Sequence, residues 1–217
     1  MNSHSIESNL EYWIQQIKSD IEKGIYKPQQ SIICEVPKKG GSTRPAAYLE
    51  YEDRLVYAAC VGACYKEIFE FIDSEIGQID MSNILSSDPL SPKWVSSSFG
   101  VWKKFQDKSL EAINDFATYV VITDISACFE NVDIKRLIDD LREIGCNSEI
   151  LNLLSNCLNT WTKLIGRGIP QGYNASQILV KFYLSQIDNF LKDDYQHLRY
   201  VDDIRIFVRV KLKPRRH

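Results

Sequence analysis

Two adjacent carboxylates near the end of the chain, Asp202 and Asp203, constrain its fold more than any other feature. They close the tetrapeptide Tyr200-Val201-Asp202-Asp203, which has apolar residues in alternation on both sides. Such alternation around a tight turn predicts two short antiparallel strands with the Asp pair at the tip. Neighbouring carboxylates repel each other and favour a bound cation such as Mg²⁺, which prefers oxygen ligands. Because Asp is also common in ordinary turns, the tetrapeptide alone leaves a metal site and a plain hairpin turn equally open.

The composition indicates a globular protein rather than a membrane or fibrous one. The chain has 217 residues, a net charge of −3 and 44% hydrophobic residues, which allows one large domain or two small ones around a substantial core. No apolar run is long enough to span a membrane, and the N-terminal residues lack the apolar region of a secretory signal. We therefore expect a cytoplasmic protein without a membrane partner.

The distribution of charge is more informative than its sum, which does not favour a dedicated nucleic-acid binder. Basic residues gather in 38–44 and in 205–217. These segments could contact phosphates locally on a protein that is acidic overall. A solvated basic face explains the segregation nearly as well.

The six cysteines are better explained as buried free thiols than as a metal site. Only Cys60 and Cys64 are close in sequence, and the three histidines are scattered. A structural zinc site would need further soft ligands beside that pair. In a reducing compartment, a free cysteine behaves as a small apolar residue of the core.

Hydrophobic periodicity predicts a mixture of helices and strands. Helices are expected at 10–21, 50–71, 102–116, 133–144, 148–161 and 175–190. Strands are expected at 31–36 and 43–49, and a buried strand at 119–123 leads to Asp124. Residues 73–98 lack periodicity and are rich in Ser, Asp and Pro, which predicts a long surface loop or insertion.

Three segments carry the residues expected of phosphoryl-transfer chemistry. Asp124 ends a predicted strand, the Gly-rich stretch 168–172 precedes a helix, and the Asp pair lies on the hairpin. Two-metal phosphoryl transfer requires carboxylates from separate strands at one point, with the ions about 4 Å apart. Asp124 and Asp202 are candidates for that pair, and the carbonyl oxygen of Ile125 is a further candidate ligand.

Five short motifs, taken in order, resemble those of reverse transcriptases. The three palm motifs are represented by TDISACFENVD at 123–133, by GIPQG at 168–172 with Ser176 and YLSQID at 183–188, and by YVDD at 200–203. The fingers motifs of bacterial members resemble VPKKG at 36–40 with Arg44 and Pro45, and EDRLV at 52–56. The resemblance runs from residue 30 to the end. Its wording is closest to retron, group II intron and abortive-infection or phage-defence enzymes.

The resemblance implies an α+β fold of fingers and palm. Residues 1–115 would form a fingers-like region, and residues 116–217 a partial palm with a ferredoxin-like antiparallel sheet and helices. The chain ends shortly after the third palm motif, so the helical thumb of family members is expected to be absent. The implied reaction is the transfer of deoxynucleotides from dNTPs to a primer 3′-OH, on an RNA template with a DNA or RNA primer.

The same resemblance assigns the catalytic carboxylates. Asp124, Asp202 and Asp203 would be catalytic and would bind two Mg²⁺ ions together with the carbonyl of Ile125, with Mn²⁺ as a substitute. Phosphoryl-transfer catalysis consists almost wholly of positioning and charge neutralisation, which is the work that such carboxylates do.

The resemblance also assigns the groups that hold the nucleotide. Lys38 or Lys39, with Arg44, would hold the triphosphate, and Gln171 would contact the incoming dNTP and the template. Phe129 would lie under the sugar and leave no room for a 2′-OH. Each has an ordinary alternative, namely a Lys-rich surface turn, a polar surface Gln and a Phe of the core.

Tyr200 and Gly172 are expected on the primer and template side of the site. Without a thumb, the chain should hold duplex weakly, because polymerase affinity comes from phosphate contacts spread over many residues. The palm sheet should also expose apolar surface. The alternative to an active enzyme is therefore a non-catalytic remnant or split subunit that binds nucleic acid or a second chain supplying the thumb.

Overall fold

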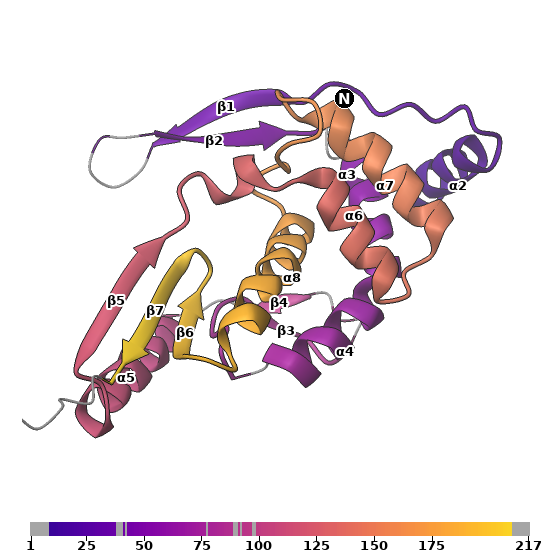
Figure 1. Cartoon of the computed structure of the whole chain (residues 1–217). Coiled ribbons are helices and arrows are strands. Elements are labelled where there is room, and N and C mark those ends of the chain that lie inside the picture. Colours follow the sequence, from indigo (N-terminus) through magenta and orange to yellow (C-terminus); the bar gives the residue numbers. More distant parts are fainter. Residues whose placement is uncertain are drawn as a thin grey trace, which may run out of the picture.

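A computed structural model describes residues 9–37, 41, 43–76, 78–88, 91, 93–96 and 99–209. Its central feature is an antiparallel sheet whose strands, within the described residues, lie in the order β5-β7-β6. The strands are β5 (Tyr119–Asp124), β6 (Gln196–Tyr200) and β7 (Asp203–Val208). Because β6 and β7 are joined by two residues only, the predicted hairpin is confirmed, and β5 lies beside it (Figure 1).

Helices α8 (Asn174–Leu191) and α5 (Phe99–Asp115) cover opposite faces of this sheet. Arg199 of β6 bonds to Asp188 of α8, whereas the ring of the next residue, Tyr200, contacts Trp102 and Phe105 of α5. Successive side chains of a strand point to opposite faces. Since Tyr200 pairs with Asp203, and Asp203 pairs with Asp124, these three residues share the face that α5 covers in part.

The remaining elements form a hairpin and a helical layer. Strands β1 (Ile32–Pro37) and β2 (Thr43–Tyr48) pair antiparallel, as predicted. The helices are α2 (Leu10–Glu22), α3 (Tyr51–Ala63), α4 (Tyr65–Ile76), α6 (Ile134–Glu143) and α7 (Ser148–Trp161), with a 3₁₀ turn η1 (Cys128–Asn131). Figure 1 shows the β1–β2 hairpin and the β5-β7-β6 sheet toward one side, with α3, α6 and α7 gathered toward the other.

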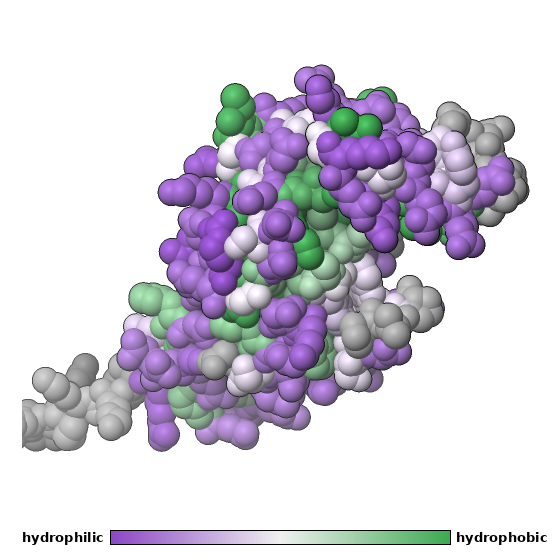
Figure 2. Space-filling view, turned by 90° about the vertical axis from the view of Figure 1, so that its right-hand side faces the viewer, coloured by the Kyte–Doolittle hydropathy of each residue, from purple (hydrophilic) through white to green (hydrophobic). Residues whose placement is uncertain are grey.

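One core cluster joins the helices α3, α6, α7 and α8. Val61, Leu137, Leu154 and Phe182, from α3, α6, α7 and α8, are all buried in it. On the face that Figure 2 presents, hydrophilic residues dominate and the hydrophobic ones gather toward the middle. None of the described helices is both long and apolar enough to cross a membrane.

Local signals placed the ends of α6 and α7 correctly. The Asp133 carboxylate accepts a hydrogen bond from the Arg136 N–H at 2.9 Å, and the Asn147 side chain caps α7 in the same way. Gly145 follows α6 with φ +98°, a conformation that suits glycine. The helices over 133–144 and 148–161 are therefore confirmed.

The helical structure expected at 50–71 is confirmed, but it is interrupted at Cys64, which divides it into α3 and α4. Packing explains the break. Trp94 lies against the last turn of α3, where a Cβ on Gly62 would be 3.1 Å from its ring. The Tyr65 hydroxyl donates to the carbonyls of Ser86 and Trp94. Both contacts come from distant residues, so the local pattern gives no sign of them.

The surface loop expected at 73–98 is also wrong in part. Helix α4 extends to Ile76, short strands β3 (Ile84–Leu85) and β4 (Val95–Ser96) pair with each other, and residues 80–83 are buried. The polar side chain of Asp80 is buried because it forms ion pairs with Lys181 and Arg199. Low hydrophobicity therefore did not mean exposure here.

The strand at 119–123 is confirmed, but its expected burial is wrong. Strand β5 lies at the edge of the sheet, so it has one neighbour, and Tyr119, Val121 and Ile122 are 62%, 49% and 69% exposed. The expectation that the palm sheet exposes apolar surface is thus confirmed. Five of the cysteines are buried free thiols, as expected, whereas Cys34 on β1 is exposed.

Candidate active site

The sheet brings the three predicted catalytic carboxylates to one end of two neighbouring strands. Asp124, the last residue of β5, is the direct partner of Asp203, the first residue of β7. The Ile125 N–H donates to the Asp202 carbonyl at 3.2 Å, which extends the pairing into the turn. Directly opposed residues have Cβ atoms about 5 Å apart. Asp124 and Asp203, from two separate strands, are therefore direct neighbours across the ladder.

The backbone at the tip of the hairpin is strained. Val201, the first of the two turn residues, has φ +58°. This left-handed region is rare for a β-branched residue and costs about 1–3 kcal/mol. A tight hairpin turn needs positive φ at this position, where glycine or asparagine is usual. The surrounding structure must therefore hold Val201 in place.

The surroundings of Asp203 leave one of its oxygens without a hydrogen bond. Asp203 Oδ1 is buried and accepts none from the residues that the structure describes. Arg205 Nε lies 3.7 Å from it, beyond hydrogen-bond distance, while the Arg205 guanidinium lies over the Phe105 ring at 4.3 Å. A buried oxygen in this state favours a cation nearby.

The charges of Asp124 and Asp202 act together on one neighbour. Burial first, and then the nearby Asp202 and Asp124 carboxylates, raise the pKa of the Cys128 thiol to about 11 against the opposing effect of Arg199. The thiol is therefore neutral at physiological pH and is a poor ligand. What remains is a set of carboxylate oxygens and the Ile125 carbonyl, a set that fits Mg²⁺.

The side chains are not gathered tightly around a single point. Among the described residues, no group of three His, Cys, Asp or Glu side chains has the arrangement of a metal site. The backbone pairing of Asp124 with Asp203, and the position of Asp202 at the tip, are what the structure contributes to such a site.

Phe129 lies in η1, directly after the strand that carries Asp124. Its ring is partly buried against the core, and its carbonyl accepts a hydrogen bond from the Ile169 N–H at 2.9 Å. Gly168 makes this contact possible, since a Cβ there would be 3.1 Å from the Glu130 carbonyl. The glycine-rich loop is therefore held against η1.

The same loop also reaches the β1–β2 hairpin. The Ala47 N–H of β2 donates to the Gln171 carbonyl at 3.2 Å. The Ser176 hydroxyl donates to the Pro170 carbonyl and lies 2.7 Å from the Tyr57 hydroxyl. Gly172 follows, exposed, with φ +115°. The loop thus fixes the position of β2 relative to the palm.

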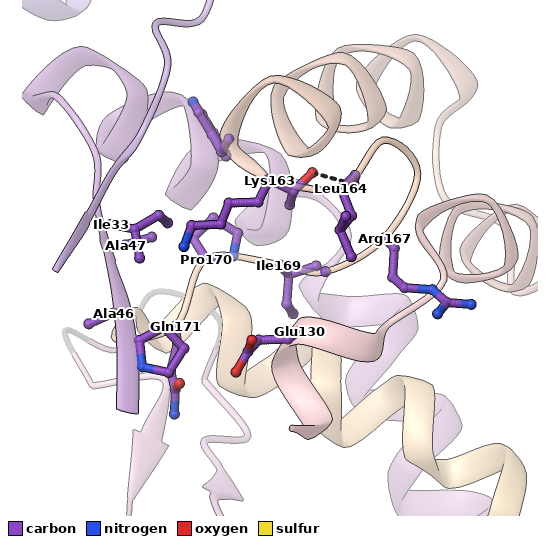
Figure 3. A pocket seen from close by; sticks show the side chains of 14 residues that line it. Ile33, Ala46, Ala47, Glu130, Lys163, Leu164, Arg167, Ile169, Pro170 and Gln171 are labelled. Carbon is purple, nitrogen blue, oxygen red and sulfur yellow. Dashed lines mark hydrogen bonds between the residues drawn. The ribbon is translucent and has the colours of Figure 1, made fainter. Parts of the chain in front are cut away.

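A cavity of about 310 Å³ lies between β2 and this loop (Figure 3). Its walls are mainly apolar, and its polar groups include Glu130, Lys163 and Gln171. In Figure 3 the Lys163 side chain runs toward Ala47, whereas the Arg167 side chain points away. The cavity therefore combines mainly apolar walls with the charged side chains of Lys163 and Glu130 and the Gln171 amide.

The other predicted residues are only partly placed. Arg44 is exposed on β2, opposite Val36, and Lys38 and Lys39 lie outside the described residues. Tyr200 is partly buried, and its ring contacts Trp102 at 4.9 Å and Phe105 at 5.6 Å, so α5 holds it. Its role on the primer side, like the roles of Arg44 and Gly172, stays a prediction.

Sequence reasoning missed the charged residues behind the hairpin. Arg199 precedes the tetrapeptide, and Asp188 ends the second palm motif, yet neither received a role. Both are completely buried and bonded to each other. The sequence held a signal for this pair. Arg199 is a charged residue on the inward side of a short strand, and Asp188 is a charged residue on the apolar side of a helix.

The family model described as "Reverse transcriptase (RNA-dependent DNA polymerase)" matches residues 36–215. No curated protein matches the chain at a significant level. Among solved structures, apo telomerase from Candida tropicalis truncated from its C-terminal domain is 14% identical with a TM-score of 0.54, over 84% of this chain and 44% of that one.

Telomerase from Candida albicans, in complex with the TWJ fragment of telomeric RNA, is similar to the same degree. It is 14% identical with a TM-score of 0.55, over 95% of this chain and 42% of that one. At such identities the likeness concerns the fold, and it confirms the expected α+β architecture. The chain spans less than half the length of these two telomerase chains.

Proposed function

This chain belongs to the reverse transcriptase family, and from that premise we propose that it transfers deoxynucleotides from dNTPs to a primer 3′-OH on an RNA template. The observation that carries the proposal is the pairing of Asp124 with Asp203, with Asp202 at the adjoining turn. The template, primer and dNTP are substrates of the proposed reaction.

The carboxylates would hold two Mg²⁺ ions, or Mn²⁺ in their place, together with the Ile125 carbonyl. Bound ions would lower the pKa of the primer hydroxyl and neutralise charge on the leaving pyrophosphate. The chain itself keeps Asp124 and Asp203 opposed through the β5–β7 ladder. Because the ladder fixes both strands, little reorganisation is needed when the substrate binds.

Phe129 and Gln171 would position the nucleotide beside these carboxylates. Phe129 lies in η1, on the turn that follows Asp124. Its carbonyl accepts a hydrogen bond from the loop that carries Gln171. We assign the Phe129 ring to the sugar and Gln171 to the nucleotide and template. Arg44, with Lys38 or Lys39, would contact the triphosphate from the β1–β2 side.

Primer extension on poly(rA)/oligo(dT) with labelled dTTP and Mg²⁺ tests the proposal. Asp202→Asn should lower incorporation by at least about 100-fold, because it removes a charge that the transition state needs. Asp194→Asn is the matched control, since Asp194 is exposed between α8 and β6 and should leave incorporation unchanged. Equal incorporation by wild type and Asp202→Asn, or none by the wild type in excess over template–primer, contradicts the proposal.

A binding subunit that needs a second chain is the alternative, and the exposed edge of the sheet favours it. Tyr119, Val121 and Ile122 on β5 present apolar surface that a partner could cover. In that case the chain alone would show no incorporation at any concentration. Incorporation would then require a partner that supplies the contacts of a thumb.

Phage defence is the biological role that we propose from the wording of the motifs, which is closest to retron, group II intron and abortive-infection or phage-defence members. The test is the efficiency of phage plating on bacteria that express the wild type or Asp202→Asn. Protection that is equal in the two strains, or absent from both, contradicts a polymerase-dependent defence role.

A further inference from the structure

Five charged or titratable side chains form a buried cluster behind the catalytic hairpin. They are Asp80, Lys181, Asp188, His197 and Arg199, and each is at least nine-tenths buried. Lys181 and Arg199 each lie 2.9 Å from Asp80 Oδ2, and His197 lies 3.3 Å from Asp188. The cluster joins the segment after α4 to α8 and β6.

Arg199 is the centre of this cluster, and all its guanidinium nitrogens have partners. Nε bonds to both oxygens of Asp188 at 3.0 and 2.9 Å, and Nη2 bonds to Asp188 at 2.5 Å and reaches Asp80. Nη1 instead donates to the carbonyl of Val201 at 3.0 Å. Asp188 and Asp80 thus hold Nε and Nη2 of Arg199, while Nη1 holds the turn at Val201.

The backbone of Arg199 is fixed as well. Its N–H donates to the Ile79 carbonyl at 3.0 Å, and its carbonyl accepts from the Met81 N–H at 2.9 Å. Lys181 adds a bond of 2.8 Å to the Ser82 carbonyl. The segment 79–82 therefore lines the outer edge of β6 and keeps Asp80 in reach of Arg199.

Stability alone is a weak explanation for such a cluster. Burying charges is costly, and apolar residues of similar volume often serve equally well. Although burial alone would raise it, the pKa of Asp188 is lowered by the bonds from His197 and Arg199, so the carboxylate stays charged. The bond from Arg199 to Val201 has a clear use, because Val201 occupies the strained position at the tip.

We propose that Arg199, held by Asp188 and Asp80, is a positioning residue that fixes the Val201 turn and thereby the orientation of Asp202 and Asp203. This inference rests on the proposed polymerase function. Arg199 does not touch the substrate. It acts by holding the carbonyl of Val201, so that the two following carboxylates keep one position relative to Asp124.

Arg199→Lys tests the proposal, because lysine keeps the charge but cannot bond to two acids and to Val201 at once. Arg54→Lys is the matched control. Arg54 donates to the Leu49 carbonyl and lies over the rings of Tyr48 and Tyr51, away from the β6–β7 hairpin. Two measurements are needed, namely primer-extension kinetics and hydrogen exchange resolved to the peptide 196–208.

Arg199→Lys should lower kcat by about 10- to 100-fold with the KM for dNTP within about threefold of wild type, as expected for misplaced catalytic groups. It should also speed exchange in 196–208 with little change elsewhere, whereas Arg54→Lys should do neither. If Arg199→Lys fails to fold, Asp188→Asn serves in its place, since it weakens the same fork.

Wild-type kcat in folded Arg199→Lys overturns the proposal, as does hairpin exchange that equals that of wild type or rises equally over the whole chain. If the wild type itself incorporates no nucleotide, the proposed polymerase function fails. The exchange measurement then still decides whether Arg199 holds the turn, so the two failures are distinguishable.

Discussion

At the scale of single residues, the site depends on a few side chains whose surroundings restrict what they can do. Asp203 keeps a buried oxygen that no described residue hydrogen-bonds, and Val201 keeps a backbone conformation that few β-branched residues adopt. Phe129 is held by a hydrogen bond to its carbonyl and by the packing of its ring against the core. Each feature concerns position, which is what phosphoryl transfer requires of a protein.

Phe129→Ala should relax the discrimination against ribonucleotides. If the ring excludes the 2′-OH, its removal should raise the ratio of kcat/KM for rTTP over dTTP by about 10- to 200-fold, the range for a change in the size of a pocket. Single-nucleotide extension with each substrate measures the ratio. Phe190→Ala is the control, because Phe190 is 80% exposed on α8. An unchanged ratio for Phe129→Ala would show that the ring only packs in the core.

At the scale of elements, the loop between α7 and α8 joins β2 to η1. On one side, N–H groups of the loop donate hydrogen bonds to the carbonyls of Phe129 and Val132. On the other side, a loop carbonyl accepts a hydrogen bond from the Ala47 N–H. Both nucleotide-side candidates, Phe129 and Gln171, depend on this one loop. Its glycine at position 168 is required by both a positive φ and a close backbone contact.

Gly168→Ala should therefore destabilise the chain and impair activity together. The added Cβ would be 3.1 Å from the Glu130 carbonyl at φ +96°, so we expect a loss of about 1–3 kcal/mol in the free energy of unfolding. Gly24→Ala, at φ +68° with nothing within 4 Å of the added Cβ, should cost only about 1 kcal/mol. Urea unfolding followed by tryptophan fluorescence compares them. Equal losses would refute the role of the Glu130 contact.

At the scale of the whole molecule, local rules predicted most of the elements, and long-range contacts decided the rest. The caps at Asp133 and Asn147 and the hairpin at 196–208 follow from neighbouring residues. The break at Cys64 and the burial of Asp80 do not, because each depends on partners far along the chain. The pairing of Asp124 with Asp203 follows from the predicted strands, and their catalytic role stays a prediction. The ion pairs around Arg199 were not predicted, because Asp80 and Asp188 lie far from it in sequence.

The buried thiols of this single core should make the fold sensitive to alkaline pH. Burial raises the pKa of Cys60 and of Cys157 to about 12 and that of Cys128 to about 11, from the ordinary value of 9.0. Since the unfolded chain loses these protons at lower pH than the folded chain, their contribution to the free energy of unfolding is complete below pH 9 and declines as the pH rises toward 11 and 12.

Urea unfolding at intervals from pH 8 to pH 11 should show this decline in the free energy of unfolding. For Cys128→Ala, its slope against pH should be smaller above pH 9. Cys34→Ala, at an exposed position, should keep the wild-type slope. A slope that is the same in wild type and Cys128→Ala would mean that Cys128 titrates alike in the folded and unfolded chain.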